Sequence, residues 1–456
     1  MLICNMPEYT YEASLILDLF EGAADLPVSL TCREEGKTLL AEVTVGGRLF
    51  SFKETLSAEV PLLVKREKKR FYKLAVYHAL KTVTGKQPPW GALTGIRPTK
   101  LAYMQEELGV EPLSFLQNKM DVSQEKTQVV AEIMRQQKGI YEKGDQNYNL
   151  FVSVPFCPTK CEYCSFISAE ISKCQRFIQP YTQAVIREIE GVKPLLKQGK
   201  LRSVYIGGGT PVSLPKENLL RIMQAVGKVN CEYTVEAGRP DAITKENLQI
   251  LKDFGVTRVC VNPQTFSDET LVRIGRKHTT AQTEQAFYWA REFGFDINMD
   301  FIAGLSGESA EEFLRGMERV CALAPENVTV HTLSLKKGSA LKERVSRLTE
   351  GEVGQMVSGA YRILSEAGYF PYYLYRQKYM AGNLENVGFT KQGKACVYNV
   401  DIMEETAPIV ACGANAVSKR VFNAENRIER YASPKDLPTY LQKTDKIILE
   451  KAEFFA

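Results

Sequence analysis

The sequence is poor in histidine and has no long apolar run, and each absence narrows what the protein can be. Only 3 of its 456 residues are histidine, which leaves few ligands for zinc sites that mix cysteine with histidine. No apolar stretch reaches the roughly 18 residues of a transmembrane helix, and the N-terminus lacks the charged and apolar segments of an export signal. The net charge is only +4 and no basic tail is present, so nothing favours nucleic-acid binding. We expect a cytoplasmic protein with no integral membrane segment and no nucleic-acid partner.

The chain is long enough for two or three domains. Hydrophobic residues make up 44% and charged residues 25% of it, as in globular proteins with well-packed cores. We predict an N-terminal accessory region at 1–148, a core domain at 149–340 and a C-terminal, substrate-covering domain at 341–456. The first region is expected to hold a small α/β unit followed by helices, and the last to be α+β.

Between residues 149 and 340, short β runs alternate with amphipathic helical segments, as in parallel βαβ units. The β runs are predicted at 151–154, 203–206, 233–236, 258–261, 296–302 and 328–333. The helices between them are predicted at 181–190, 216–226, 245–254, 280–293 and 310–323. Six such units predict an α/β fold, a partial (β/α)6 TIM-like barrel, in which chemistry gathers at the C-terminal strand ends.

The regions on either side of this core are predicted to be mixed. Near the N-terminus we expect a helix at 11–20 and strands at 28–32 and 39–45, with a Gly46-Gly47 turn. Further helices are predicted at 65–83, 98–108 and 123–140, with a break at 86–91. Beyond the core, we predict a helix at 351–367 and strands at 397–403 and 409–412.

The most informative motif is the triplet Cys157, Cys161 and Cys164, spaced C-x₃-C-x₂-C directly after the first β run of the core. Cubane iron–sulfur clusters take cysteine thiolates as ligands, and three on one loop leave the fourth iron open to a small chelating ligand. A structural zinc site would need a fourth ligand, and neither a nearby histidine nor a second C-x₂-C pair supplies one. Disulfide frameworks suit small secreted chains. The spacing favours a cluster, with zinc or reduced structural thiols as alternatives.

Glycines and polar side chains follow two other predicted strands. The run from Gly207 to Gly209, with Thr210 after it, permits a close backbone approach to a ligand, although such runs also make ordinary turns. Gln264 and Arg276 could clamp a bound amino acid and its sugar, since they offer an amide and a bidentate guanidinium. A solvated helix face is the alternative for this pair.

Two acids also stand out. Glu236 ends the third β run, where it could bind an ammonium group or ribose hydroxyls; a surface charge or a helix cap is the alternative. Asp300 lies in an otherwise apolar β run, and a buried carboxylate is costly unless it is paired or ligand-bound. A structural hydrogen bond is the alternative there. His278 and His331 are candidate haem ligands or plain packing residues, and the stretch 374–388 could line a substrate mouth or form a solvated loop.

In this order, the motifs resemble those of the oxygen-independent coproporphyrinogen III oxidase family of radical S-adenosylmethionine (SAM) enzymes, over about residues 150–418. The segments at 91–100 and 375–386 resemble its HemZ branch, which carries an extra N-terminal domain. The resemblance implies a [4Fe–4S] cluster on Cys157, Cys161 and Cys164, with SAM beside it and no catalytic residue beyond these two groups. It implies cofactor-binding residues at Tyr163, Phe166, Gly208, Gly209, Thr210, Glu236, Gln264, Arg276 and Asp300.

The resemblance also implies an oxidoreductase of haem biosynthesis. In that family a radical derived from SAM takes a hydrogen atom from a propionate of the tetrapyrrole substrate, and loss of CO₂ leaves a vinyl group. An electron donor such as flavodoxin, ferredoxin or a reductase is implied as a partner. From charge alone, the candidates for contacts with the propionates are Arg273, Lys277, Arg376 and Lys378.

Departures from the family pattern keep other functions open. Phe151 and Ser153 stand where the decarboxylating oxidases have tyrosine and histidine, and Phe166 stands where they have a further cysteine. The alternatives are a haem-binding trafficking protein that carries a cluster, and a radical SAM methylase or ring-opening enzyme acting on haem. The trafficking branch has an HN-x₂-YW motif, whose nearest counterpart, at 397–401, has no histidine.

Overall fold

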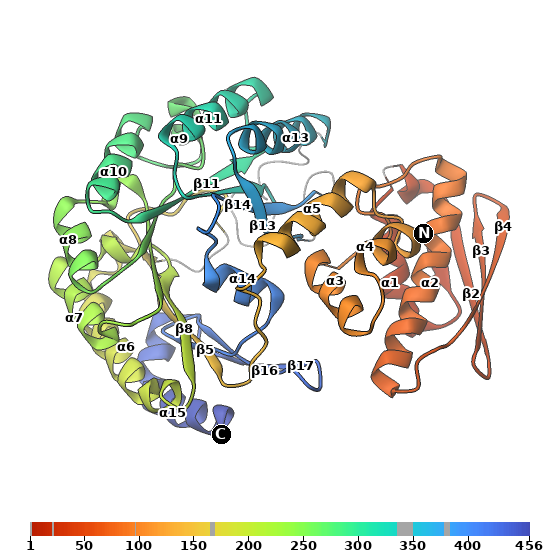
Figure 1. Ribbon diagram of the computed structural model, residues 1–456, viewed down its shortest axis with the longest axis horizontal. Helices are drawn as coiled ribbons and strands as arrows, with labels where there is room; N and C mark the ends of the chain where they lie inside the picture. Colours follow the sequence, from red (N-terminus) through yellow and green to blue (C-terminus); the bar gives the residue numbers. More distant parts are fainter. Residues whose placement is uncertain (1, 21, 96, 165–168, 335–349, 378–383) are drawn as a thin grey trace. The chain divides into compact units, whose positions relative to one another are not determined.

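The computed structural model describes residues 2–20, 22–95, 97–164, 169–334, 350–377 and 384–456. It contains two compact units, Met1–Ala131 and Glu132–Ala456 (Figure 1). The predicted domain boundary near residue 148 stays a prediction, and the one near residue 340 lies outside the described residues. None of the helices in the described ranges is both long enough and apolar enough to cross a bilayer.

The N-terminal unit is a four-stranded sheet with helices. Its strands are ordered as they follow in the chain: β1 (Leu2–Cys4), β2 (Val28–Glu35), β3 (Thr38–Val45) and β4 (Arg48–Thr55). Its helices are α1 (Pro7–Leu17), α2 (Pro61–Thr84), α3 (Pro98–Glu107) and α4 (Pro112–Ser114), and α5 (Gln124–Gln136) continues into the second unit. Gly46 and Gly47 have φ of 54° and 83°, as the tight β3–β4 hairpin requires. The predicted helix, strands and turn are confirmed here, whereas β1 and β4 were not predicted.

The second unit is built on an 11-stranded sheet with the order β13-β14-β12-β11-β10-β9-β8-β5-β15-β16-β17. The six predicted strands are confirmed as parallel neighbours: β5 (Asn147–Val154), β8 (Lys200–Gly208), β9 (Glu232–Gly238), β10 (Arg258–Val261), β11 (Asp296–Ala303) and β12 (Asn327–Thr332). The chain adds β13 (Phe370–Tyr375), β14 (Asn386–Thr390), β15 (Ile409–Cys412), β16 (Val417–Phe422) and β17 (Arg427–Ala432). Because β13 and β17 are the two edges, the sheet is an open, partial barrel, as predicted.

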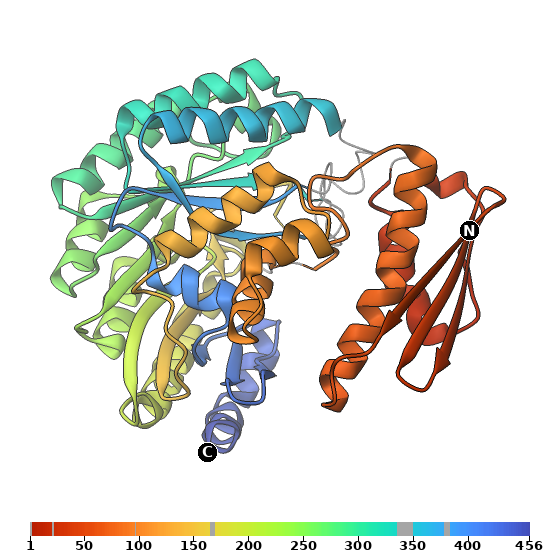
Figure 2. The same ribbon diagram turned by 45° about the vertical axis from the view of Figure 1, so that its right-hand side comes forward.

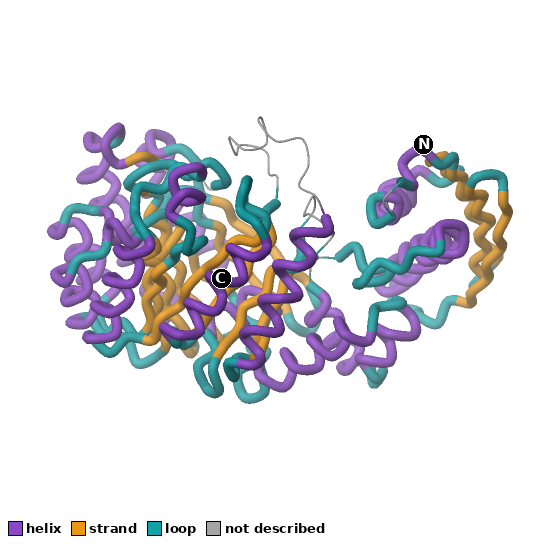
Figure 3. The backbone as a smooth tube through the Cα atoms, turned by 90° about the horizontal axis from the view of Figure 1, so that it is seen from above, coloured by secondary structure: helices purple, strands orange, loops and turns teal. Residues whose placement is uncertain are grey.

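Helices cover the outside of this sheet, while the strands lie inside (Figure 3). They are α6 (Gln175–Leu196), α7 (Lys216–Val226), α8 (Lys245–Asp253), α9 (Asp268–Arg273), α10 (Thr280–Glu292), α11 (Ala310–Leu323), α13 (Glu350–Glu366) and α15 (Leu437–Phe455). Capping boxes at Thr279 and Ser309 start α10 and α11. In Figure 2, α13 lies beside α11. Helices on one face and core contacts on the other bury the parallel strands on both sides.

One predicted strand is wrong. Residues 397–403 lie in the helix α14 (Val397–Glu404), although their β-branched side chains favour a strand. The reason is a tertiary contact, because the Glu232 carboxylate at the start of β9 accepts from the amides of Val397 and Tyr398 at 3.0 and 3.1 Å. This carboxylate satisfies two of the four amides that any helix start leaves open, so the partner outweighs the local preference.

A buried ion pair attaches α15 to α6. Glu188 and Lys451 are both fully buried and in direct contact. The Glu188 carboxylate also accepts from the Gly413 amide at 2.8 Å, and the Lys451 ammonium donates to the carbonyl of Ala411 in β15. Since β15 pairs with β5, this contact supports the strand that leads into the cysteine loop.

Candidate functional site

The cysteine loop leaves β5 through the short strand β6 (Phe156–Cys157). It reaches the segment that follows α9, where the Glu162 amide donates to the carbonyl of Ile274 at 3.1 Å. The Thr159 hydroxyl donates to the carbonyl of Gly275 at 3.4 Å. The loop is therefore held against the C-terminal side of the sheet, next to the connection after β10.

The three thiols of this loop can be compared with what each kind of cysteine site requires. None of the cysteines in the described ranges forms a disulfide. Within the described residues, no three histidine, cysteine or acidic side chains converge on a single metal position, as a mononuclear zinc site would require. A cubane makes no such demand, because each thiolate binds a different iron at a separate corner.

Two polar side chains reach sulfur atoms of the loop. The Thr210 hydroxyl donates to Cys157 Sγ at 3.6 Å, and Nη1 of Arg239 donates to Cys161 Sγ at 3.7 Å. Hydrogen bonds to cluster sulfurs are one way in which a protein tunes an iron–sulfur site. Thr210 was a predicted site residue and Arg239 was not, although its charge directly after a strand was a usable signal.

The glycine run lies where any side chain would collide. A Cβ on Gly207 would come within 2.5 Å of the Glu236 carboxylate, and one on Gly209 within 2.6 Å of the carbonyl oxygens of Val154 and Phe156. Gly208 has φ of 95°, a conformation that favours glycine. The run is therefore a cradle built from bare backbone, and its role in binding a ligand stays a prediction.

The amides of this run are already in use. The Gly208 amide donates to the Glu236 carboxylate at 3.0 Å. The amides of Gly209 and Thr210 donate to the carbonyl oxygens of Val154 and Phe156 at 2.8 and 2.7 Å. The group that the run could offer a ligand is consequently a carbonyl oxygen, which is an acceptor. An acceptor suits the ammonium group of an amino acid.

Glu236 lies beside the glycine run in β9. Its carboxylate accepts from the Tyr205 hydroxyl at 2.6 Å as well as from the Gly208 amide. Burial raises the pKa of Glu236 to about 7, although both donors lower it, and the Asp300 carboxylate raises it further. A carboxyl that titrates near neutrality in a buried site is a functional candidate.

Arg276, Gln264 and Tyr163 meet where β10 ends. The Arg276 side chain is buried, and it donates to the Tyr163 hydroxyl at 3.0 Å and to the carbonyl of Asn262 at 2.5 Å. Gln264 has φ of 71°, which is uncommon for any residue except glycine. Its amide donates to the carbonyl of Asp300 at 2.9 Å, so this connection is held against β11. The structure brings these predicted residues together beside the cysteine loop.

Asp300 lies in β11 with a partly exposed side chain. Burial raises its pKa, but the nearby His331 imidazole and the hydrogen bond from the Asn298 amide at 2.8 Å outweigh burial and hold the pKa below its usual range. His331 Nε2 is 3.9 Å from the carboxylate, and its Nδ1 is 3.4 Å from the Tyr375 hydroxyl. Asp300 thus begins a loosely spaced carboxylate–imidazole–phenol series at the ends of β11, β12 and β13.

An aromatic stack that was not predicted lines the inner side of the strands. The rings of Tyr205 and Tyr398 are stacked with centroids 4.4 Å apart, and each also stacks with Phe151 at 6.2 Å. Tyr398 comes from α14, so residues almost 200 positions apart meet here. The Tyr205 hydroxyl links this stack to Glu236.

The remaining candidates differ in placement. Arg376 is buried at the end of β13, and burial lowers its pKa to about 10. His278 is buried 3.9 Å from Asp241, and burial together with Arg276 lowers its pKa to about 3. The predicted positions Phe166 and Lys378 lie outside the described residues.

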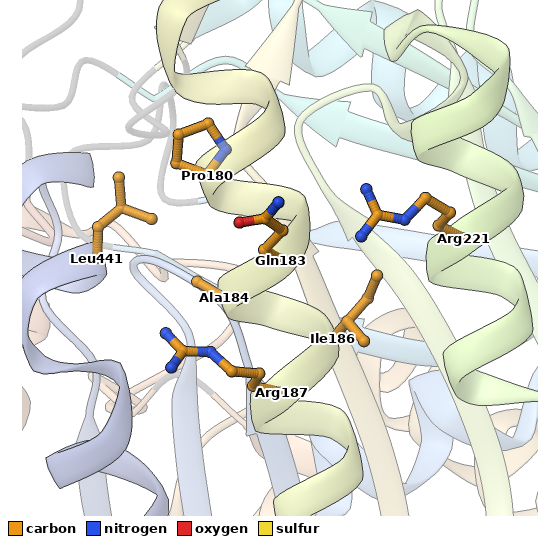
Figure 4. Close-up of a pocket in the computed structure, with 7 residues that line it drawn as sticks. All are labelled: Pro180, Gln183, Ala184, Ile186, Arg187, Arg221 and Leu441. Atoms are coloured by element: carbon orange, nitrogen blue, oxygen red, sulfur yellow. The ribbon is translucent and has the colours of Figure 1, made fainter.

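A surface pocket lies elsewhere, on the outer helices α6, α7 and α15 (Figure 4). Its arginines are already paired, Arg187 with Asp445 at 2.9 Å and Arg221 with Gln179 at 3.1 Å. None of the predicted site residues lines it. It is not part of the candidate site.

The comparison with known proteins agrees with this geometry. The family model described as the Radical SAM superfamily matches residues 151–320, and proteins of that superfamily use a [4Fe–4S] cluster and SAM. The chain is 33% identical to the oxygen-independent coproporphyrinogen-III oxidase-like protein HemZ of Bacillus subtilis, over 99% of this chain and 94% of that protein. It is 26% identical to the heme chaperone HemW of Haemophilus influenzae, over 64% of this chain and 76% of that one.

A solved structure supports the fold. Coproporphyrinogen III oxidase (HemN) from Escherichia coli matches with a TM-score of 0.55 and 20% identity, over 68% of this chain and 71% of that one. The full-length similarity and the superfamily match lead to one conclusion. The chain belongs to the oxygen-independent coproporphyrinogen-III oxidase-like family of radical SAM proteins.

Proposed function

We propose that the protein is a radical SAM oxidoreductase that acts on a tetrapyrrole, by oxidative decarboxylation of the propionates of coproporphyrinogen III. One observation carries the proposal: the cysteine loop, the glycine cradle and Glu236 lie together at the C-terminal ends of neighbouring parallel strands. That is the end of such sheets where chemistry gathers. Full-length similarity to an oxidase-like relative supports it.

When bound, the cluster and SAM supply the radical that abstracts hydrogen from substrate, so the protein supplies binding and orientation. Cys157, Cys161 and Cys164 would hold three irons. The carbonyl oxygens of Gly208 and Gly209 would receive the methionine ammonium, with Thr210 beside them. In this proposal Glu236, Gln264, Arg276 and Asp300 hold the polar groups of SAM, and Tyr163 and Phe166 complete the site. An external electron donor such as flavodoxin, ferredoxin or a reductase is part of the proposal.

Substrate recognition is proposed for the β12–β13 side of the site. The Arg376 guanidinium stays cationic at neutral pH, since burial lowers its pKa only to about 10. Arginine binds carboxylates bidentately, and the propionates of a tetrapyrrole are carboxylates. Arg273 is a second candidate, and it also donates to Ser306 and Thr270.

The decisive experiment is an anaerobic reaction of the reconstituted full chain with SAM, a reductant, coproporphyrinogen III and a one-electron acceptor. The acceptor is needed because loss of CO₂ from the substrate radical releases one electron as the vinyl group forms. Mass spectrometry should find products that have lost one and two carboxyl groups, together with 5′-deoxyadenosine. A Cys157→Ser variant is the control and should form neither. Intact substrate in the presence of a loaded cluster would rule the oxidase out.

A second candidate function is haem binding for delivery elsewhere. It is supported by the relatives named heme chaperones and by Phe151 and Ser153, which replace two residues of the decarboxylating oxidases. His331, with 28% of its side chain exposed, is a better axial ligand than the buried His278. Stoichiometric haem uptake with a Soret band, lost in His331→Ala and retained in His278→Ala, would favour this function. Methyl transfer to the product would instead indicate a methylase.

A further inference from the structure

The three cysteines of the loop have unequal surroundings. Cys157 receives a hydrogen bond from a neutral hydroxyl, that of Thr210, whereas Cys161 receives one from the Arg239 guanidinium. Cys161 is also the most buried of the three thiols. A charged donor therefore faces one corner of the proposed cluster site.

Arg239 is held firmly in that position. It follows β9 directly and is 3% exposed. Its Nε and Nη2 donate to the two carboxylate oxygens of Asp241 at 2.9 and 2.8 Å. Its remaining nitrogen, Nη1, donates to the Thr159 hydroxyl at 2.9 Å and to Cys161 Sγ at 3.7 Å. A planar guanidinium with a bidentate partner on one edge has a fixed direction for the other edge.

The orientation of this ion pair has an electrostatic consequence. The positive end of the Arg239–Asp241 pair faces the sulfur, and the negative end faces away from it. Reduction adds one negative charge to a cluster and its thiolates, so a nearby cation and N–H···S bonds stabilise the reduced state. An effect of this kind is stronger in a buried site than in water.

We propose that Arg239 is a positioning residue of the cluster site, which fixes the Cys161 thiolate and makes the cluster easier to reduce. The inference rests on the proposed function, because it requires a cluster on the three cysteines. It adds a residue that neither the motif nor the resemblance assigned. Arg276 also lies beside Cys161, since that thiol is one of the groups that raise the pKa of Arg276. It donates to Tyr163 and Asn262, and it belongs to the proposed SAM-binding set.

The test is the reduction potential of the reconstituted full chain, without SAM. Arg239→Met keeps the length of the side chain but removes its charge and its hydrogen bonds. At a fixed potential, we expect the ratio of reduced to oxidised cluster to fall about tenfold, which is a midpoint shift of about 59 mV to more negative values for a one-electron couple. Mediated titration followed by electron paramagnetic resonance measures this shift, after iron analysis has shown equal loading.

Arg258→Met is a matched control. Arg258 is also a buried arginine with a carboxylate partner, Glu232 at 2.8 Å, but its described contacts are not with the cysteine loop. Its loss should leave the midpoint at the wild-type value. A general effect of removing a buried guanidinium would shift both variants equally and would overturn the proposal.

A conservative variant keeps the test decisive if Arg239→Met does not fold. Arg239→Lys retains the charge but loses the bidentate contact with Asp241, and we expect a smaller negative shift. A wild-type midpoint in a fully loaded Arg239 variant overturns this inference alone. A wild-type chain that binds no iron overturns the proposed function and this inference together.

Discussion

The polar groups near the C-terminal ends of the parallel strands form two halves, one on the β8–β9 side and one on the β11–β12 side. The two halves differ in how tightly their polar groups are paired. On the β8–β9 side, Glu236 accepts hydrogen bonds at 2.6 and 3.0 Å, and the glycine run leaves no space for a Cβ. On the β11–β12 side, His331 lies 3.9 Å from Asp300 and 3.4 Å from Tyr375. A preorganised half suits a cofactor that must bind in one geometry. The long spacings around His331 suit a substrate whose hydrogen bonds tighten on binding, whereas Asp300 stays with the proposed SAM-binding set.

The largest effect on SAM binding is expected when a side chain is placed in the glycine run. In Gly209→Ala the new Cβ would lie 2.6 Å from two backbone carbonyl oxygens, so the backbone of the run must shift. We expect SAM to bind more than tenfold more weakly, a loss of at least about 1.4 kcal/mol, as measured by calorimetry on the iron-loaded chain. Gly354→Ala in α13 is the control, because no atom lies within 4 Å of its Cβ and alanine favours the helix. Equal SAM affinity in the two variants would contradict the cradle.

The pH dependence of SAM binding tests the difference between Glu236 in one half and Asp300 in the other. The folded-state pKa of Glu236 is raised from 4.5 to about 7, first by burial, so the carboxyl is protonated below pH 7 and ionised above it. Because an ammonium or hydroxyl donor prefers the ionised form, we expect SAM affinity to fall about tenfold from pH 8 to pH 6. Glu236→Gln should remove this dependence and bind weakly throughout. Asp300→Asn is the comparison: the pKa of Asp300 is held low, so its loss should weaken binding equally at both pH values.

The smallest effect on SAM is expected in the looser half. His331→Gln keeps a hydrogen-bonding side chain of similar reach, and the existing spacings are already long. We expect SAM affinity to change less than about threefold, or about 0.7 kcal/mol, while KM for the tetrapyrrole rises. A loss of SAM affinity as large as that of Glu236→Gln would place His331 with the cofactor instead.

Local patterns predicted most of the second unit. All six core strands and the five helices between them follow from hydrophobic periodicity, and β10, α7 and α11 have the predicted bounds. The strands β16 and β17 were missed although they pair with each other across a short connection. The strands β13 and β14 were missed because β14 depends on pairing with the distant strand β12. The helix α14 was predicted as a strand for the same reason, since its start is stabilised by Glu232, about 165 positions earlier.

The candidate site residues show the same division between local patterns and long-range contacts. Gly208 and Glu236 were predicted as candidates from their positions at strand ends, and Asp300 was predicted from its place in an otherwise apolar strand. Arg239 and Tyr205 were missed, because their roles depend on partners: Cys161, 78 positions from Arg239, and Glu236, 31 positions from Tyr205. Nothing in the spacing of residues indicates which buried donor will face which sulfur.

The buried pair between Glu188 and Lys451 has a consequence for how the protein matures. Its members are 263 positions apart, and a lone buried charge costs several kcal/mol. Until α15 packs against α6, the Glu188 carboxylate lacks its buried partner, and β15 lacks the ammonium that binds the Ala411 carbonyl. Because β15 pairs with β5, the strand that leads into the cysteine loop is fully supported only when these distant helices have come together.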